Sequence, residues 1–223
     1  MENIETDYLV IGTGAMGMAF ADALFDLSDD AHITLVDRHH RPGGHWNDAY
    51  PFVRLHQPSA FYGLNAQPLG GDAIDTTGAN QGLAEMATGQ AVLDHFEQAL
   101  RRKLLPSGRM RFVAMAEHAG ADAQGRPVLR SLLDGGETAV TVRRKRVHAT
   151  LTGTQVPATR PPRYAVSAGV RCVPPNALPG IARHCPAPPA LHRGGRGQDG
   201  HGRVPVAAAE RHRPRAHPLG GSP

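Results

Sequence analysis

A glycine-rich turn near the start of the chain limits the possible folds more than any other feature. An apolar run over residues 7–11 leads into Gly12-Thr13-Gly14-Ala15-Met16-Gly17, and residues 18–27 then carry apolar side chains at helical spacing. A second apolar run covers residues 32–36, and Asp37 follows it directly. The order of strand, tight turn, helix, strand and acid predicts an α/β fold with a Rossmann-like dinucleotide-binding domain built on a parallel sheet.

Each part of this pattern has a physical role in binding a dinucleotide. Gly12 permits the tight turn, Gly14 lets the main chain approach a pyrophosphate, and Gly17 allows the helix to pack closely on the strand. The free N–H groups of the first helical turn attract the phosphates, and Asp37 accepts hydrogen bonds from a ribose. The cofactor contacts expected here are Gly12, Gly14, Ala15, Met16, Gly17, Asp37 and Arg38. The turn alone fits both NAD and FAD, because both carry an adenosine diphosphate half.

The segment after the second strand favours FAD. It contains Gly43, Gly44, Trp46, Tyr50, Pro51 and Arg54. This pattern resembles the flavin-containing and Baeyer–Villiger monooxygenases, whose FAD domain carries Gly-Gly-x-Trp and then Tyr-Pro-x-x-Arg at the same spacing. The resemblance implies that Gly44 and Trp46 line FAD, and that NADPH reduces the flavin in the intact family. Paired glycines also allow a close approach to a ligand, and a Trp beside them can cover it.

Several histidines follow the second strand. His56 stands where the Baeyer–Villiger pattern has an acidic residue, so this chain departs from that pattern. We expect His56 and Gln57 to be polar residues facing the flavin or polar loop residues, and we include Gln57 among the cofactor contacts. His39, His40 and His45 lie nearby without Asp, Glu or Cys at ligand spacing, so no metal site is expected.

The middle of the chain predicts further elements of an FAD domain. Apolar spacing predicts a short helix near residues 83–88 and a longer one over 91–105. Short apolar runs at 111–115, 128–133, 138–142 and 147–149 predict an antiparallel meander. The FAD domains of the resembled family carry such a meander before the chain returns to the parallel sheet. Ala149-Thr150 resembles the Ala-Thr-Gly signature at the end of the return strand, with Leu151 in place of the glycine.

Charge and proline content change along the chain. Residues 1–137 hold 18 of the 20 acidic residues, whereas residues 138–223 hold 14 of the 24 basic ones. Thirteen of the 19 prolines follow residue 150, and Tyr164 is the only Phe, Trp or Tyr there. We therefore expect an incomplete FAD-binding domain over residues 1–183 and a disordered tail over 184–223. Neither a signal peptide nor a membrane span is predicted, so a soluble, cytoplasmic protein is expected.

Three explanations are open for residues 184–223. These residues could be a disordered linker or an Arg-Gly segment that binds RNA. They could also be the product of a GC-rich gene translated out of frame. A one-base shift permits Tyr-Ile-Val-Val-Gly-Ala-Gly-Lys-Thr-Gly-Met-Asp-Ala from the Leu191 codon onward, which is a strand entering a second dinucleotide turn. The resembled family has its NADPH turn at about this point. We favour a frameshift near Arg183, which removes the NADPH domain.

The function expected from the sequence is that of a flavin monooxygenase fragment. The resemblance implies an FAD-dependent NAD(P)H oxidoreductase with a small-molecule substrate, and the residues give no sign of nucleic-acid binding. No catalytic acid, base or nucleophile is identified, and the chain itself is expected to be inactive because its NADPH site is missing. The alternatives are an NAD(P)-binding Rossmann oxidoreductase and a fragment without catalytic activity.

Overall fold

The computed structural model describes residues 3–65, 67–71, 73–150, 165–169, 172–173, 177 and 179–180. The chain divides into two units, Met1–Val156 and Pro157–Pro223, and the fold below is that of the first. The expectations for residues 184–223, the frameshift near Arg183 and the unusual Leu151 all lie outside the described residues.

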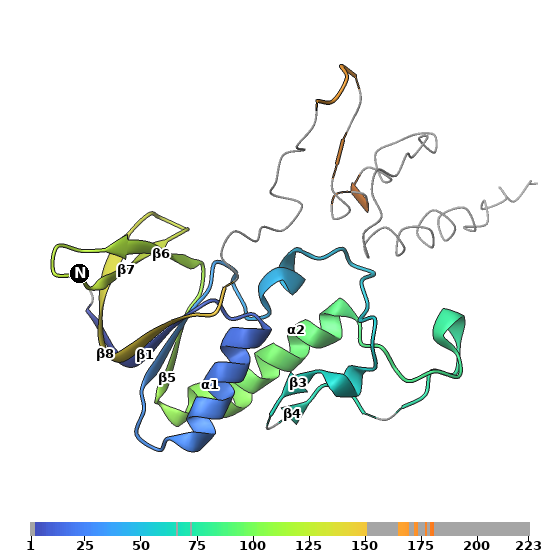
Figure 1. Cartoon of the computed structure of the whole chain (residues 1–223), viewed down its shortest axis with the longest axis horizontal. Coiled ribbons are helices and arrows are strands. Elements are labelled where there is room, and N and C mark those ends of the chain that lie inside the picture. The colour runs from blue at the N-terminus through green and yellow to red at the C-terminus, as the bar shows by residue number, and fades with distance from the viewer. Residues whose placement is uncertain are drawn as a thin grey trace, which may run out of the picture. The chain divides into compact units, whose positions relative to one another are not determined.

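One sheet of six strands organises the first unit, with the order β5-β2-β1-β8-β7-β6 (Figure 1). Parallel pairing joins β1 to β2 and β8, and β2 to β5, whereas β7 pairs antiparallel with both β6 and β8. The strands are β1 (Ile4–Ile11), β2 (Ile33–Val36), β5 (Met110–Val113), β6 (Ala116–Ala121), β7 (Pro127–Ser131) and β8 (Glu137–His148). The predicted parallel sheet is confirmed, and an antiparallel meander is present. It consists of β6, β7 and the start of β8, whereas the predicted run at 111–115 forms β5 of the parallel part and β6 was not predicted.

The strand β8 belongs to both parts of the sheet. Its first residues pair with β7, with Ala139 opposite Val128, and from Val140 to His148 it runs parallel to β1. The two separate runs predicted at 138–142 and 147–149 are therefore one strand. The charged residues 143–146 interrupt the apolar pattern in the sequence, whereas the strand continues through them with a shift of register against β1 between Val142 and Lys145.

Two helices cover one face of the parallel strands. They are α1 (Ala15–Leu27) and α2 (Gly89–Gln98), and α2 continues through a π-helical segment over Ala99–Leu104 and a 3-10 turn over Leu105–Ser107. The longer predicted helix is thus confirmed, with a change of winding in its second half. The short helix predicted near residues 83–88 is wrong, because this stretch contains a turn and a bridge between Ile74 and Ala84.

Small elements connect β2 to α2. They are 3-10 turns at Gly44–Asp48, Ser59–Phe61 and Gly78–Asn80 and a two-stranded sheet of β3 (Gly63–Leu64) and β4 (Gln67–Pro68).

The central strands β1 and β2 are largely buried on both faces, as is usual for parallel strands. All four residues of β2 are buried, and β1 sends alternate side chains to opposite sides. One apolar cluster, including Val10, Leu35 and Phe96, lies under α1 and α2. A second, including Leu9 and Leu129, lies under the meander. This double burial fixes the carboxyl ends of β1 and β2, where the glycine-rich turn and Asp37 stand.

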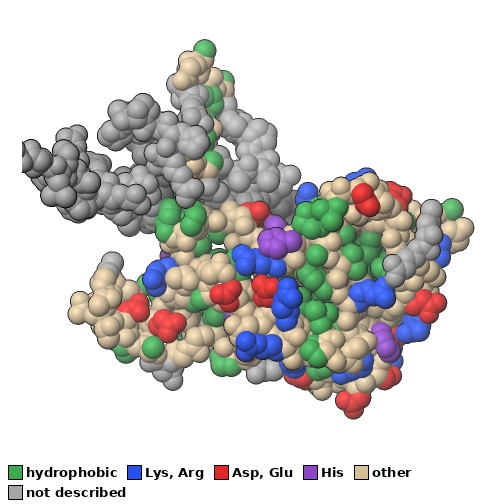
Figure 2. All heavy atoms as spheres, turned by 180° about the vertical axis from the view of Figure 1, so that it is seen from behind, with side chains coloured by type: hydrophobic (Ala, Val, Ile, Leu, Met, Phe, Trp, Pro, Cys, Tyr) green, Lys and Arg blue, Asp and Glu red, His purple; other side chains and the backbone are tan. Residues whose placement is uncertain are grey.

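Charged side chains of both signs lie next to one another on the face shown in Figure 2. Ion pairs also join distant elements: Arg143 of β8 pairs with Asp7 of β1, and Lys103 of the π-helical segment pairs with Asp22 of α1. None of the helices in the described part of the chain has the length and apolar character that a membrane crossing needs.

Candidate dinucleotide-binding site

The glycine-rich turn lies between the carboxyl ends of β1 and β8. Gly12 has a φ of +96° and donates its N–H to the Val36 carbonyl oxygen at 2.8 Å. A Cβ atom on Gly12 would lie 2.6 Å from Cγ2 of Thr150, and one on Gly17 would lie 1.9 Å from the Gly12 carbonyl oxygen. Both glycines are therefore required by the packing of the turn itself.

The N-terminus of α1 opens beside this turn without a capping side chain. Gly14 is the N-cap residue, and the first helical turn contains no acidic residue. Ala15 and Met16 are exposed, Met16 by 73%. The unpaired N–H groups and the positive end of the helix dipole thus face outward, which suits the pyrophosphate of a dinucleotide.

The Gly43-Gly44 loop rests directly on the turn. The Gly43 N–H donates to the Thr13 carbonyl oxygen at 2.8 Å, and a Cβ on Gly44 would lie 2.9 Å from the Gly14 Cα. Gly43 and Gly44 have φ values of +120° and +54°, in the region that favours glycine. The Gly43-Gly44 loop and the turn at Thr13-Gly14 are distant in sequence, and their main chains therefore contact each other at the start of α1.

Asn47 holds this loop in shape. Its Nδ2 donates to the carbonyl oxygens of Gly44 at 3.1 Å and Arg41 at 3.4 Å, and its Oδ1 accepts from Arg41 Nε at 3.1 Å. The amide replaces main-chain partners that a loop without regular structure lacks.

Asp37 is buried at the end of β2 and makes four hydrogen bonds. Its Oδ2 accepts from the main-chain N–H and the hydroxyl of Thr13, both at 2.6 Å. Its Oδ1 accepts from the main-chain N–H of His39 and is bonded to Nδ1 of the same histidine, both at 2.9 Å. Burial raises the pKa of Asp37, but the hydrogen bonds from His39 and Thr13 outweigh it and hold the pKa below its ordinary value.

His39 links Asp37 to the glycine loop. Its Nε2 lies 2.9 Å from Oδ2 of Asp48, at the end of the 3-10 turn that carries Gly44. The hydrogen bond with Asp37 raises the pKa of His39, against the effect of burial and with help from Asp48. When protonated, the His39 ring donates to both carboxylates and so joins the strand end to the loop.

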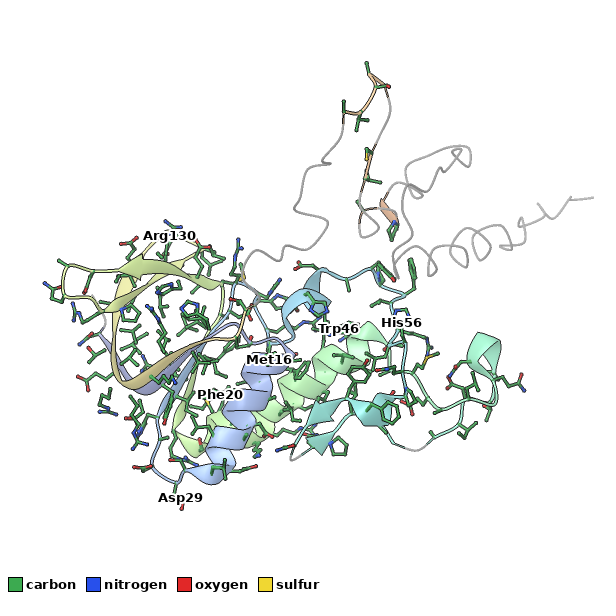
Figure 3. The ribbon with its side chains drawn as sticks, viewed as in Figure 1. Met16, Phe20, Asp29, Trp46, His56 and Arg130 are labelled. Carbon is green, nitrogen blue, oxygen red and sulfur yellow. The ribbon has the colours of Figure 1, made fainter. Side chains whose placement is uncertain are left out.

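Trp46 and the Tyr-Pro segment continue from the same loop. The Trp46 ring is half-buried against the core under α2 and stacks on His45 with ring centroids 5.3 Å apart. Tyr50 is buried, and Arg54 Nη1 donates to the Met86 carbonyl oxygen at 3.0 Å. Figure 3 shows Met16, Trp46 and His56 along one edge of the first unit, the edge at which α1 begins.

Two expected contacts point elsewhere in this structure. Arg38 is exposed, and its Nε lies 3.6 Å from a carboxylate oxygen of Glu117 on β6. Gln57 is exposed and accepts a hydrogen bond from the Tyr62 hydroxyl at 3.0 Å. These contacts lie away from the turn, and the cofactor roles of both residues stay predictions. Across the described residues, no three His, Cys, Asp or Glu side chains are grouped as a metal ion requires.

Sequence reasoning missed the residues that support the site. The sequence pattern assigns no role to Thr13, Asn47 or Asp48, and it considers His39 only to exclude a metal site. A polar residue inside the turn and a short His–Asp spacing after the acid were the available signals. Neither predicts a hydrogen bond, because the contacts form only when the loop folds back on the turn.

Comparisons with known proteins agree with this geometry. Residues 10–66 match the family model of the NAD(P)-binding Rossmann-like domain. The chain is 50% identical over 178 residues to the uncharacterized proteins Rv2000 of Mycobacterium tuberculosis and Mb2023 of Mycobacterium bovis. These alignments cover 80% of this chain and 32% of each relative, so the chain spans about a third of their length.

A solved structure has a similar fold. The polycyclic ketone monooxygenase of the fungus Thermothelomyces thermophila matches with a TM-score of 0.50 and 19% identity, over 67% of this chain and 23% of that one. The N-terminal part of this chain therefore has a Rossmann-like fold, which it shares with a flavin monooxygenase, and residues 10–66 match the NAD(P)-binding form of that fold. The predicted fold class and family resemblance are confirmed for this part of the chain.

Proposed function

We propose that this chain is the FAD-binding part of a flavin-dependent monooxygenase that takes electrons from NAD(P)H and acts on a small-molecule substrate. The contact of Gly44 with Gly14 beside the uncapped start of α1 carries the proposal. A dinucleotide turn alone suits many cofactors, whereas a second glycine loop resting on it matches the Gly-Gly-x-Trp pattern of the flavin enzymes.

The residues present fit the adenosine diphosphate half of FAD. The N–H groups that begin α1 would hold the pyrophosphate, and Gly14 leaves room for it, since a Cβ there meets only the Gly44 Cα, at 3.7 Å. Asp37 would hold the ribose, and Trp46 would exclude water on the loop side. When bound, the flavin supplies the redox chemistry, because none of these side chains transfers electrons.

A flavin-loading experiment tests this proposal. The full chain is purified, mixed with FAD and freed of unbound ligand, and its visible absorption spectrum is recorded. Retained FAD at about one equivalent supports the proposal, and loss of the flavin from Gly14→Ala ties binding to the turn. Retention of FAD by both proteins alike would contradict binding at this turn.

A second candidate is NAD(P) at the same turn. The match of residues 10–66 to the NAD(P)-binding Rossmann-like domain favours it. The same purified chain separates the two candidates when it is titrated with NADPH and FAD in parallel calorimetric experiments. Binding of NADPH that FAD does not displace would favour this candidate.

The proposed frameshift near Arg183 explains why the chain would lack its own NADPH domain. The relatives align over 178 of the 223 residues, and a change of reading frame would leave the residues after it without a counterpart in them. Sequencing the gene around the Arg183 codon tests this. An additional or missing base relative to closely related genes supports the shift, and an unbroken match in the present frame would refute it.

A further inference from the structure

The ribose acceptor of the site is fully occupied by the protein itself. An ionised carboxylate has about four acceptor positions. Asp37 uses four, two for Thr13 and two for His39. A ribose hydroxyl that donates to Asp37 must therefore replace one of these protein donors.

The imidazole of His39 is the donor best able to leave. Two of the four bonds come from main-chain N–H groups, which the turn and the end of β2 hold in place. The Thr13 hydroxyl belongs to a residue without exposed surface, and its branched side chain has few rotamers. The His39 side chain is 27% exposed and can rotate toward solvent.

The charge on His39 determines how firmly it stays. Asp37 and Asp48 are the charged groups that act on its ring, one from the end of β2 and one from the glycine loop. Arg38, the next charged neighbour along the chain, directs its guanidinium to Glu117 of β6. Imidazolium donates to both carboxylates at once, whereas neutral imidazole can donate to only one.

We infer that His39 is a gate on the ribose site: its ring occupies the position on Asp37 that the adenosine ribose of a dinucleotide requires, and it must swing away for the cofactor to bind. This inference rests on the proposed function, because it assumes that a dinucleotide binds at this turn. His39 is thus a positioning residue that sets cofactor affinity through Asp37.

The gate makes cofactor affinity depend on pH. Protonated His39 holds both carboxylates and competes with the ribose, so binding weakens at low pH. At higher pH the neutral His39 ring can donate only one of its two hydrogen bonds, so it leaves Asp37 more readily. A hydrogen bond to a charged group contributes enough that its removal changes affinity about 10- to 100-fold.

The experiment measures FAD binding by fluorescence at about pH 6 and about pH 9, a range that spans histidine titration. The proteins are the full-length chain, His39→Ala and the matched control His40→Ala, whose histidine is exposed. We expect the wild type and the control to bind FAD about tenfold or more tightly at the higher pH. His39→Ala should bind tightly at both, with little dependence on pH.

Each other outcome overturns a defined claim. Weaker binding by His39→Ala at both pH values would make His39 a support for Asp37, and it would refute the gate while leaving the proposed function intact. Failure of all three proteins to bind FAD, with folding shown by circular dichroism, would refute both. An NMR titration adds a separate readout: FAD should lower the His39 pKa in the wild type, because the ring leaves its carboxylate partners, and an unchanged His39 pKa would refute the gate.

Discussion

Gly14 and Gly17 stand three residues apart in one turn, yet a side chain at each would meet different neighbours. A Cβ on Gly14 has ordinary contact distance to Gly44, whereas a Cβ on Gly17 would overlap the Gly12 carbonyl oxygen. The first glycine is therefore free to serve a ligand, and the second serves the fold. The spacing of the glycines in the turn does not by itself separate these two roles.

Substitution of Gly14 by Ala should weaken dinucleotide binding about tenfold or more with little change in the free energy of unfolding. Gly17→Ala is the matched contrast, and it should cost about 3 kcal/mol of stability or more because main chain must move. Urea unfolding and FAD titration of both variants check this. Equal stability losses in the two proteins would contradict the assignment.

Two buried or half-buried histidines should give the stability opposite dependences on pH. The hydrogen bond with Asp37 raises the pKa of His39, so its contribution is complete below about pH 6.5 and is lost as pH rises through the folded-state pKa. Burial lowers the pKa of His95, against attraction by Asp22, and its Nε2 has no hydrogen-bond partner among the described residues. Stability linked to His95 is lost as pH falls below about 6.5.

Urea unfolding across this pH range tests both effects. His39→Gln should flatten the loss of stability at higher pH, and His95→Gln should flatten the loss at lower pH. His40→Gln, at an exposed histidine, should leave the profile unchanged. A wild-type profile that neither of the first two variants alters would contradict both assignments.

At the scale of elements, the glycine loop depends on one amide as well as on its glycines. Asn47 Nδ2 donates to the main-chain carbonyl oxygens of Arg41 and Gly44, and its Oδ1 accepts from the Arg41 side chain. Gly43 and Gly44 can adopt the positive φ values of the loop, and the hydrogen bonds of the Asn47 amide stabilise this conformation.

Asn47→Ala should loosen the loop and reduce FAD affinity, since the loop would then have to become ordered on binding. Loss of two or three hydrogen bonds in a half-buried loop should also cost about 1 to 3 kcal/mol of stability. Asn65→Ala, at an exposed turn residue, is the control. Binding by Asn47→Ala that equals binding by the control would show that the loop keeps its shape without the amide.

The elements themselves were largely predictable, and the contacts between them were not. The strand, turn and helix around Gly12 follow from local apolar spacing. The division of β8 into two runs, the placement of residues 111–115 in the meander and the short helix near residues 83–88 were wrong, because sheet pairing, which acts across the chain, overrides local pattern. The Asp37–His39–Asp48 contacts were missed for the same reason, since they depend on where the loop returns.

At the scale of the whole molecule, Gly12–Gly17 is the glycine-rich dinucleotide turn of the described residues, and the proposed frameshift removes the NADPH turn from the chain. We therefore expect no NADPH oxidation by the chain with added FAD. A version in which a one-base correction restores the second turn and the reading frame after it should oxidise NADPH. The measurement is NADPH absorbance with both proteins at equal concentration. Equal rates would refute the frameshift and the view that the missing part carries the hydride donor.

The position of β8 in the sequence also delays completion of the sheet during synthesis of the chain. One edge of β1 pairs with β2, which follows within about 25 residues, but its other edge waits for β8, whose last paired residue is His148. At about 5 to 20 residues per second, roughly 6 to 22 seconds separate the two on the ribosome. For that interval the central strand has an open edge able to join another nascent chain. Slow translation of this message should therefore increase aggregation.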